Sequence, residues 1–146
     1  GNGKGQICKE VMKYSASSSA FEKIEGISNI TDICCCNQSI LCLDSNGDIW
    51  CFGDNNKGQL GIKAPQKVNI PTKVPDVSNI STISAFPEVS ICTSNGEYFC
   101  TKSGTFQKLK FQEKVKNIEE FHAGSNFCLA LSKLTPIEDE KVRESL

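Results

Sequence analysis

The sequence predicts an all-β protein made of about three blades of a β-propeller, each blade an antiparallel four-stranded sheet, with a short C-terminal helix. Two observations support this fold class. Short sequence anchors recur with a period of roughly 50 residues, and strand-like runs within each copy are joined by turn residues. Because a single blade cannot bury both of its faces, neighbouring blades must stack to form the core.

The repeat is visible at several anchors in the same order. Ser-Asn-Ile at residues 28–30 recurs at residues 78–80, and Lys-Asn-Ile follows at 116–118. Ser-Asn-Gly at residues 45–47 recurs at 94–96. Asn29 and Asn79, which also lie in N-x-S/T triplets, therefore have a structural explanation as one repeated position.

Taken in chain order, these anchors divide the sequence into copies. Lys-Gly-Gln-Ile at residues 4–7 matches Lys-Gly-Gln-Leu at 57–60, so we expect residues 1–7 to be the tail of a preceding repeat. Residues 8–20 then read as a surface loop. The partial propeller domain is expected to span residues 1–133, with repeats at about 21–62, 71–104 and 106–132.

A hairpin is predicted in the first repeat. Residues 40–43 form a continuous apolar run, and the Ser-Asn-Gly turn at 45–47 supplies residues that accept positive φ. Residues 48–53 follow with alternating faces, as expected of a strand. The second and third copies offer similar strand pairs, at residues 90–101 and 118–132.

Two connecting segments complete the chain. Residues 63–75 hold three prolines and read as an extended connection, because proline lacks a ladder donor. Thr135, Pro136 and Glu138 fit the start of a helix, as N-cap, first helical residue and capping-box acid. We therefore expect residues 134–146 to form a helix leading to a downstream region that is absent.

Composition excludes several classes of protein. Lys and Arg number 16 and Asp and Glu 17, giving a net charge of −1, so a basic nucleic-acid binder is not expected. No apolar run is long enough for a membrane-spanning helix, and no signal peptide is visible. These features favour an intracellular protein, cytoplasmic or nuclear, that does not contact a membrane.

Nine cysteines suggest neither disulfides nor a metal site. Their number is odd, residues 34–36 are three in a row, no C-x2-C pair occurs, and His122 is the single histidine. The cysteines therefore read as small buried hydrophobic residues in a reducing compartment. No catalytic motif appears, and we expect no catalytic residue, no metal and no cofactor.

The segment 45–61, Ser-Asn-Gly-Asp-Ile-Trp-Cys-Phe-Gly-Asp-Asn-Asn-Lys-Gly-Gln-Leu-Gly, resembles the signature of the regulator of chromosome condensation repeat. The resemblance extends over residues 1 to about 132, although Ser39, Val89 and Phe127 stand where the family has histidine. The positions assigned to the repeat signature are Gly47, Trp50, Phe52, Gly53, Gly58, Gln59, Leu60, Gly61, Gly96 and Gly124.

We expect these signature residues to stabilise the fold rather than to form a binding or catalytic site. Glycines suit close backbone approach or positive φ, and Asp and Asn side chains bond their own backbone in turns. The stretch Asp54, Asn55, Asn56 and Lys57 is kept as a candidate interaction loop.

The resemblance implies a protein-protein interaction scaffold, present here as a fragment of a larger protein. The alternative that it implies is a guanine-nucleotide exchange factor, which would act by binding a small GTPase in its nucleotide-free state. The expected partners are thus proteins, a small GTPase among them. The open blade faces are expected to pack against the rest of the propeller or another copy of the chain.

Overall fold

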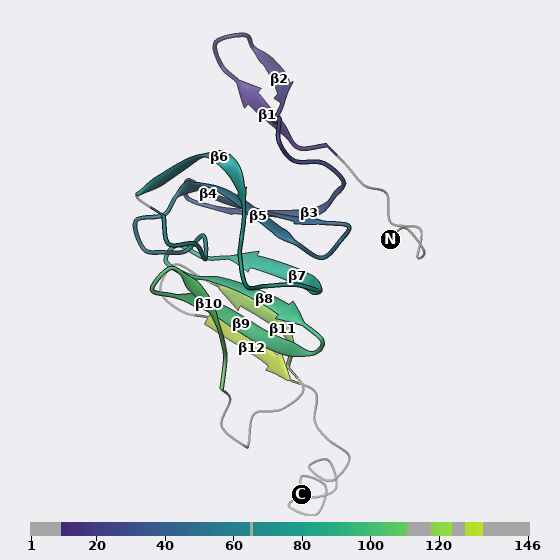
Figure 1. Cartoon of the computed structure of the whole chain (residues 1–146), viewed down its shortest axis with the longest axis vertical. Helices are drawn as coiled ribbons and strands as arrows, with labels where there is room; N and C mark the ends of the chain where they lie inside the picture. Colours follow the sequence, from purple (N-terminus) through teal and green to yellow (C-terminus); the bar gives the residue numbers. More distant parts are fainter. Residues whose placement is uncertain (1–9, 65, 111–117, 124–127, 133–146) are drawn as a thin grey trace, which may run out of the picture. The chain divides into compact units, whose positions relative to one another are not determined.

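The computed structural model describes residues 10–64, 66–110, 118–123 and 128–132, and every regular element among them is a β-strand. The chain divides into two compact units, residues 1–109 and 110–146. The first unit holds one two-stranded sheet and two four-stranded sheets, and the second holds a two-stranded sheet (Figure 1). The helix expected at 134–146 lies outside the described residues.

Each four-stranded sheet is an antiparallel meander, in which every strand pairs with the next along the chain. The first sheet consists of β3 (Ile30–Cys36), β4 (Ser39–Asp44), β5 (Ile49–Asp54) and β6 (Lys67–Lys73). The second sheet consists of β7 (Ile80–Ala85), β8 (Ser90–Ser94), β9 (Glu97–Lys102) and β10 (Thr105–Lys108). The two short sheets are antiparallel hairpins formed by β1 (Met12–Ser15) with β2 (Ala20–Lys23), and by β11 (Ile118–Ala123) with β12 (Cys128–Ser132).

The hairpins β3–β4, β7–β8 and β11–β12 are copies of one unit. In all three, the isoleucine that begins the first strand pairs with the residue that ends the second strand. The register then shifts by one residue at the same repeat position, between Ile30 and Asp32, Ile80 and Thr82, and Ile118 and Glu120. Thus β11 and β12 correspond to the first and second strands of a four-stranded sheet.

The remaining pairs of strands, β1–β2, β5–β6 and β9–β10, share a different pattern. In each pair, the second strand ends in a lysine, and the residue after that lysine donates its N–H to a carbonyl at the start of the first strand. The three bonds are Ile24 to Val11 (2.9 Å), Val74 to Ile49 (2.8 Å) and Leu109 to Tyr98 (2.8 Å). The lysine forms an ion pair with the acidic residue that directly precedes this carbonyl residue in the sequence. The pairs are Lys23 with Glu10 (3.0 Å), Lys73 with Asp48 (2.9 Å) and Lys108 with Glu97 (2.8 Å). Since β5–β6 and β9–β10 are the third and fourth strands of their sheets, β1 and β2 correspond to the third and fourth strands of a four-stranded sheet.

The turn between β4 and β5 also links the two four-stranded sheets. The buried carboxylate of Asp44 accepts the backbone N–H groups of Asn46 and Asp48 (2.9 Å each) and the indole N–H of Trp50 (3.0 Å). Gly47 adopts φ +82° at the turn, as its Ser-Asn-Gly context predicts. Its carbonyl accepts the N–H of Ile80 (2.9 Å), which joins the first sheet to the second.

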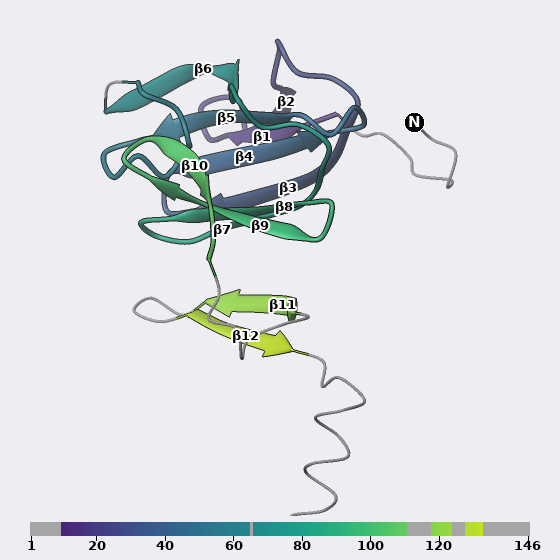
Figure 2. The ribbon, with the colours of Figure 1, turned by 60° about the horizontal axis from the view of Figure 1, so that its bottom comes forward.

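Alternation along β4 and β5 gives the first sheet two apolar faces. Leu41 and Cys51 belong to a cluster that also includes Ile83 on β7 and Cys92 on β8 of the second sheet. Figure 2 shows β7 lying beside β3 of the first sheet. Cys42 faces the other way, with Trp50 and Phe52 packed in the same cluster as Val11. The predicted stacking of neighbouring sheets is therefore present between the first and second sheets.

Two segments differ from the prediction. The loop expected at residues 8–20 is instead a hairpin in part, since β1 begins at Met12 and residues 16–19 form the turn to β2. The connection expected at residues 63–75 contains β6, with Pro71 inside the strand. A proline is tolerated there because β6 is an edge strand, and the register breaks between its pairs with Cys51 and Gly53.

Candidate protein-interaction groove

The loop of residues 54–64, hereafter the 54–64 loop, leads from β5 toward β6 and is held together by Asn55. This side chain is buried, with 5% of its surface exposed. Its Oδ1 accepts the N–H of Leu60 (3.1 Å), and its Nδ2 donates to the carbonyls of Ile62 (3.1 Å) and Ala64 (3.3 Å). Asn55 thus satisfies three backbone groups that the loop would otherwise leave unpaired.

Gln59 fastens the same loop to the first sheet. It is 1% exposed, and its Nε2 donates to Ser39 Oγ (2.9 Å) and to Asp54 Oδ2 (3.0 Å). Its Oε1 accepts the N–H of Lys57 (2.9 Å), and the Ser39 hydroxyl donates to the Asp54 carbonyl (2.8 Å). Every polar atom of the Gln59 amide therefore has a partner, as a buried amide requires.

Glycines bring the 54–64 loop against the β9–β10 turn of the second sheet. A Cβ added to Gly58 would lie 2.6 Å from the backbone nitrogen of Gly104, and one added to Gly61 would lie 2.3 Å from the ring of Phe106. A Cβ on Gly104 would in turn lie 2.9 Å from the carbonyl oxygen of Ile62. The loop is therefore supported from both sheets, and only glycine allows this approach.

A groove of about 450 Å³ lies where the loop meets the β9–β10 turn. Its exposed polar side chains include Asn56, Lys57 and Lys63. Asn56 donates to the Asp54 carboxylate, and Lys57 Nζ lies 3.8 Å from Glu88 Oε1, the lysine and the glutamate both being largely exposed. Such an exposed ion pair is weak, so an incoming acidic group can compete for the lysine. We call this hollow the polar groove.

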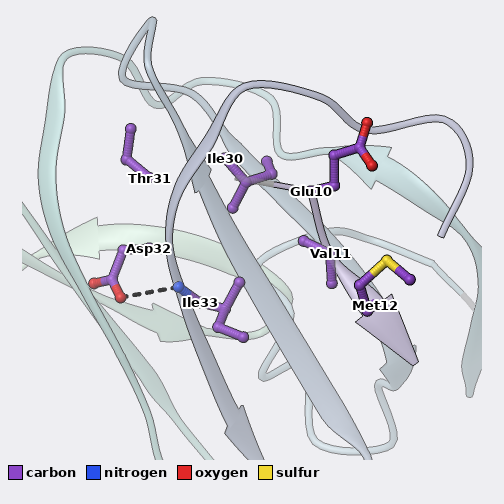
Figure 3. Close-up of a pocket in the computed structure, with 7 residues that line it drawn as sticks. All are labelled: Glu10, Val11, Met12, Ile30, Thr31, Asp32 and Ile33. Carbon is purple, nitrogen blue, oxygen red and sulfur yellow. Dashed lines mark hydrogen bonds between the residues drawn. The ribbon is translucent and has the colours of Figure 1, made fainter. Parts of the chain in front are cut away.

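A second hollow, of about 280 Å³, lies between β1 and β3. Figure 3 shows the side chains of Val11, Met12, Ile30 and Ile33 around it. Its polar members are Glu10, Thr31 and Asp32, and the Asp32 carboxylate accepts the N–H of Ile33 (2.9 Å). We call it the apolar hollow, because apolar side chains form most of its lining.

Among the described residues, neither a metal-binding cluster nor a reactive buried thiol occurs. Within these ranges, no group of three or more His, Cys, Asp and Glu side chains could hold a metal ion. Burial raises the pKa of the Cys42, Cys51 and Cys92 thiols to about 12, which keeps them protonated and poorly nucleophilic. No apolar helix long enough to cross a membrane occurs in the part of the chain that the structure describes.

The four residues of the predicted interaction loop differ in exposure and in role. Asn56 and Lys57 stand exposed on the polar groove, whereas Asn55 is buried inside the loop and Asp54 anchors Gln59. Of the predicted signature positions, Gly124 lies outside the described residues. Sequence reasoning did not predict that Ser39 bonds Gln59 or that Asp44 bonds Trp50, because no spacing rule connects side chains that meet only through strand pairing.

Comparison with protein families identifies the repeat. Two models described as the regulator of chromosome condensation (RCC1) repeat match the chain, one at residues 46–86 and one at residues 30–59. Both include the β5 strand and the start of the 54–64 loop. No curated protein matches the chain in sequence.

Solved structures share the fold at low identity. Human WBSCR16 matches with a TM-score of 0.67 and 18% identity over 90% of this chain. Yeast RCC1 (Prp20), solved bound to Kap60, matches with a TM-score of 0.68 and 18% identity over 88% of this chain. Prp20p from Saccharomyces cerevisiae, which was studied for its binding to Gsp1p and histones, matches with a TM-score of 0.67 and 17% identity over 87% of this chain.

The matched part is 38%, 36% and 37% of those three chains, so this chain spans less than two fifths of each. The all-β class predicted from the sequence is confirmed by the two four-stranded meanders and by these neighbours. Residues 30–86 therefore carry regulator of chromosome condensation repeats, and the chain has the fold of β-propeller blades.

Proposed function

We propose that this chain is a protein-interaction scaffold, and that the polar groove binds an acidic segment of a partner protein. The observation that carries the proposal is the groove itself, in which exposed Lys57 and Lys63 stand on a loop held rigid from two sheets. A preorganised loop loses little conformational entropy on binding, so its exposed groups contribute more of their interaction energy. The two lysines favour carboxylate-bearing partners.

Two further points support a scaffold inside the cell rather than an enzyme. Among the described residues, no disulfide joins Cys34, Cys35, Cys42, Cys51, Cys92 or Cys100, which suits a reducing compartment. The structural neighbour Prp20 was solved bound to Kap60 and was studied for its binding to Gsp1p and histones, all of which are proteins. Guanine-nucleotide exchange on a small GTPase remains the alternative function, and a second assay on the captured partners can measure it.

The test is charge reversal in the groove. A chain carrying both Lys57→Glu and Lys63→Glu should lose its partners, while Lys110→Glu, an exposed lysine outside the groove, should retain them. Partners captured from a cell extract by the parent chain and by each variant are quantified by mass spectrometry, and at least a tenfold loss is expected for the acidic proteins among them. Equal capture by all three forms would contradict the proposal.

A second measurement addresses the alternative. Any small GTPase among the captured proteins is loaded with a labelled nucleotide, and the release of that nucleotide is followed with and without the chain. Capture without faster release supports a scaffold. Faster release that the Lys57→Glu and Lys63→Glu pair abolishes would instead assign exchange activity to the polar groove.

A further inference from the structure

Asparagine followed by glycine is a reactive pair in a polypeptide, because the glycine nitrogen can attack the asparagine side chain and glycine carries no side chain to block the attack. The chain has three such pairs, at residues 2–3, 46–47 and 95–96. The first pair lies outside the described residues, and the other two lie in the turns β4–β5 and β8–β9. The sequence around these two is nearly the same, Ser-Asn-Gly-Asp and Ser-Asn-Gly-Glu, so a large difference in their reactivity has its origin in structure.

The β4–β5 turn is held by Asp44 on all sides. The Asp44 carboxylate accepts the N–H groups of Asn46 and Asp48 (2.9 Å each). Its backbone carbonyl accepts the N–H of Gly47 (3.1 Å), which is the nitrogen that would have to attack Asn46. Gly47 is also packed, since a Cβ added to it would lie 3.1 Å from the Cα of Asn79. Attack in this turn therefore requires several bonds to break first.

The β8–β9 turn lacks this support. Ser94 takes the place of Asp44, because each pairs with the isoleucine that begins the first strand of its sheet. The Ser94 hydroxyl donates to the carbonyl of Ser78 (3.1 Å) and not to the turn. The turn is also shorter, since Ser94 pairs with Glu97 and leaves only residues 95–96 between them. No carboxylate equivalent to that of Asp44 is present to hold its backbone.

Asn95 and Gly96 are both exposed at the tip of this hairpin. Their φ angles of 51° and 76° are those of a type I′ turn. A Cβ added to Gly96 would have no atom within 4 Å. In the part of the chain that the structure describes, neither the Gly96 N–H nor the Asn95 side chain has a hydrogen-bond partner. The attacking nitrogen and the side chain that it would attack are therefore both accessible.

We propose that Asn95 is a site of spontaneous deamidation and that Asn46 is protected from it. The Gly96 nitrogen loses its proton to water and bonds to Cγ of Asn95, while the Cγ–Nδ2 bond breaks and ammonia leaves. Water then opens the resulting succinimide ring, which gives aspartate or isoaspartate at position 95. The inference goes beyond the scaffold function and does not depend on the polar groove.

The product changes the turn in two ways. A new negative charge is placed beside Glu97, whose carboxylate already holds Lys108 Nζ at 2.8 Å. Isoaspartate also lengthens the backbone by its Cβ atom, which a two-residue turn matched to its strands cannot take up without disturbing the Ser94–Glu97 pair. The free α-carboxylate of isoaspartate is the group that isoaspartyl methyltransferases esterify, with the methyl group coming from the sulfonium of S-adenosylmethionine. An enzyme of this class is therefore the partner expected at position 95.

The first experiment incubates the 146-residue chain at physiological temperature and mildly alkaline pH, and follows each asparagine by peptide mass spectrometry. Asn95 should deamidate at least tenfold faster than Asn46, because the bonds that hold the β4–β5 turn add to the barrier there. Methyl transfer from labelled S-adenosylmethionine by a purified isoaspartyl methyltransferase should label the peptide that contains residue 95. Asn95→Gln, which moves the side-chain carbonyl away from the Gly96 nitrogen, should abolish both signals at this position.

The second experiment tests whether structure sets the difference. In urea, where the turns are lost, Asn46 and Asn95 should react at similar rates, because their sequence contexts match. Asp44→Ser gives the first turn the residue found in the second, and should speed deamidation at Asn46 while circular dichroism shows a folded chain. The urea comparison decides the question even if this variant does not fold. Equal rates at the two asparagines of the folded chain, or an intact Asn95 there while it reacts in urea, would each overturn the proposal.

Discussion

At the scale of single residues, two buried serine hydroxyls have opposite environments. Ser39 is 2% exposed, and its Oγ has Gln59 and Asp54 as partners. Ser90 is 1% exposed, and its Oγ has no partner among the described residues. A buried hydroxyl without a partner lowers stability, because it has lost its hydrogen bonds to water.

These environments predict changes of opposite sign. Ser90→Ala should raise the free energy of unfolding by about 1 kcal/mol, since the unpaired hydroxyl is removed. Ser39→Ala should lower it by about 2 kcal/mol, because the Gln59 amide and the Asp54 carbonyl lose their partner. Urea unfolding followed by the fluorescence of Trp50 measures both. Destabilisation of equal size in the two variants would show that Ser90 Oγ is satisfied in solution.

At the scale of elements, the contact between the 54–64 loop and the β9–β10 turn depends on glycine. Gly58→Ala should cost roughly 3 kcal/mol, because it combines positive φ (+72°) with a Cβ 2.6 Å from the Gly104 nitrogen. Gly96→Ala is the matched control, because it has φ +76° with open space around its Cβ. It should cost about 1 kcal/mol, the strain of the left-handed backbone alone.

The difference between the two glycine variants isolates the loop–turn contact. Thermal unfolding of the two variants beside the parent chain measures it. If Gly58→Ala and Gly96→Ala lower stability equally, the loop is free to move away from the turn, and the rigidity assigned to the polar groove is wrong.

The hairpins are predictable because their signals are local. The Ser-Asn-Gly turn and the alternation after it identify β4 and β5, and the repeat extends the prediction to β8 and β9. Strand β6 escapes prediction because Pro71 argues against a strand unless its edge position is known. Strand β1 escapes it because the clearest feature that it shares with its repeat partners, β5 and β9, is a single acid near the start of the strand.

The candidate site is predictable only in part, for a similar reason. Asn56 and Lys57 follow a recognisable signature and lie on the polar groove. Lys63 and Ser103 complete its lining from positions that carry no motif, and Ser103 comes from the second sheet. A site assembled between sheets requires knowledge of how the sheets stack, which spacing within one repeat does not supply.

At the scale of the molecule, cysteines take positions in the apolar layers that hold the sheets together. Cys51 and Cys92 belong to the cluster between the first and second sheets, and Cys42 to the cluster on the other face of the first sheet. All three are 0% exposed, and burial raises the pKa of each thiol from 9.0 to about 12. The cores of the described sheets therefore depend on thiols that stay neutral.

This dependence predicts a loss of stability at high pH. A thiol in the unfolded chain ionises near pH 9, whereas the same thiol in the folded sheets ionises near pH 12. The unfolded state therefore releases protons first, so the stabilisation is complete below pH 9 and declines as the pH rises toward 12. Urea unfolding between about pH 7 and pH 10.5 should show the start of this decline. A variant with alanine at residues 42, 51 and 92 should start from lower stability but decline less steeply, because the three thiols with the largest rise in pKa are gone. An equally steep decline in that variant would assign the effect to the other groups whose pKa is raised, Lys23, Cys35 and Cys100.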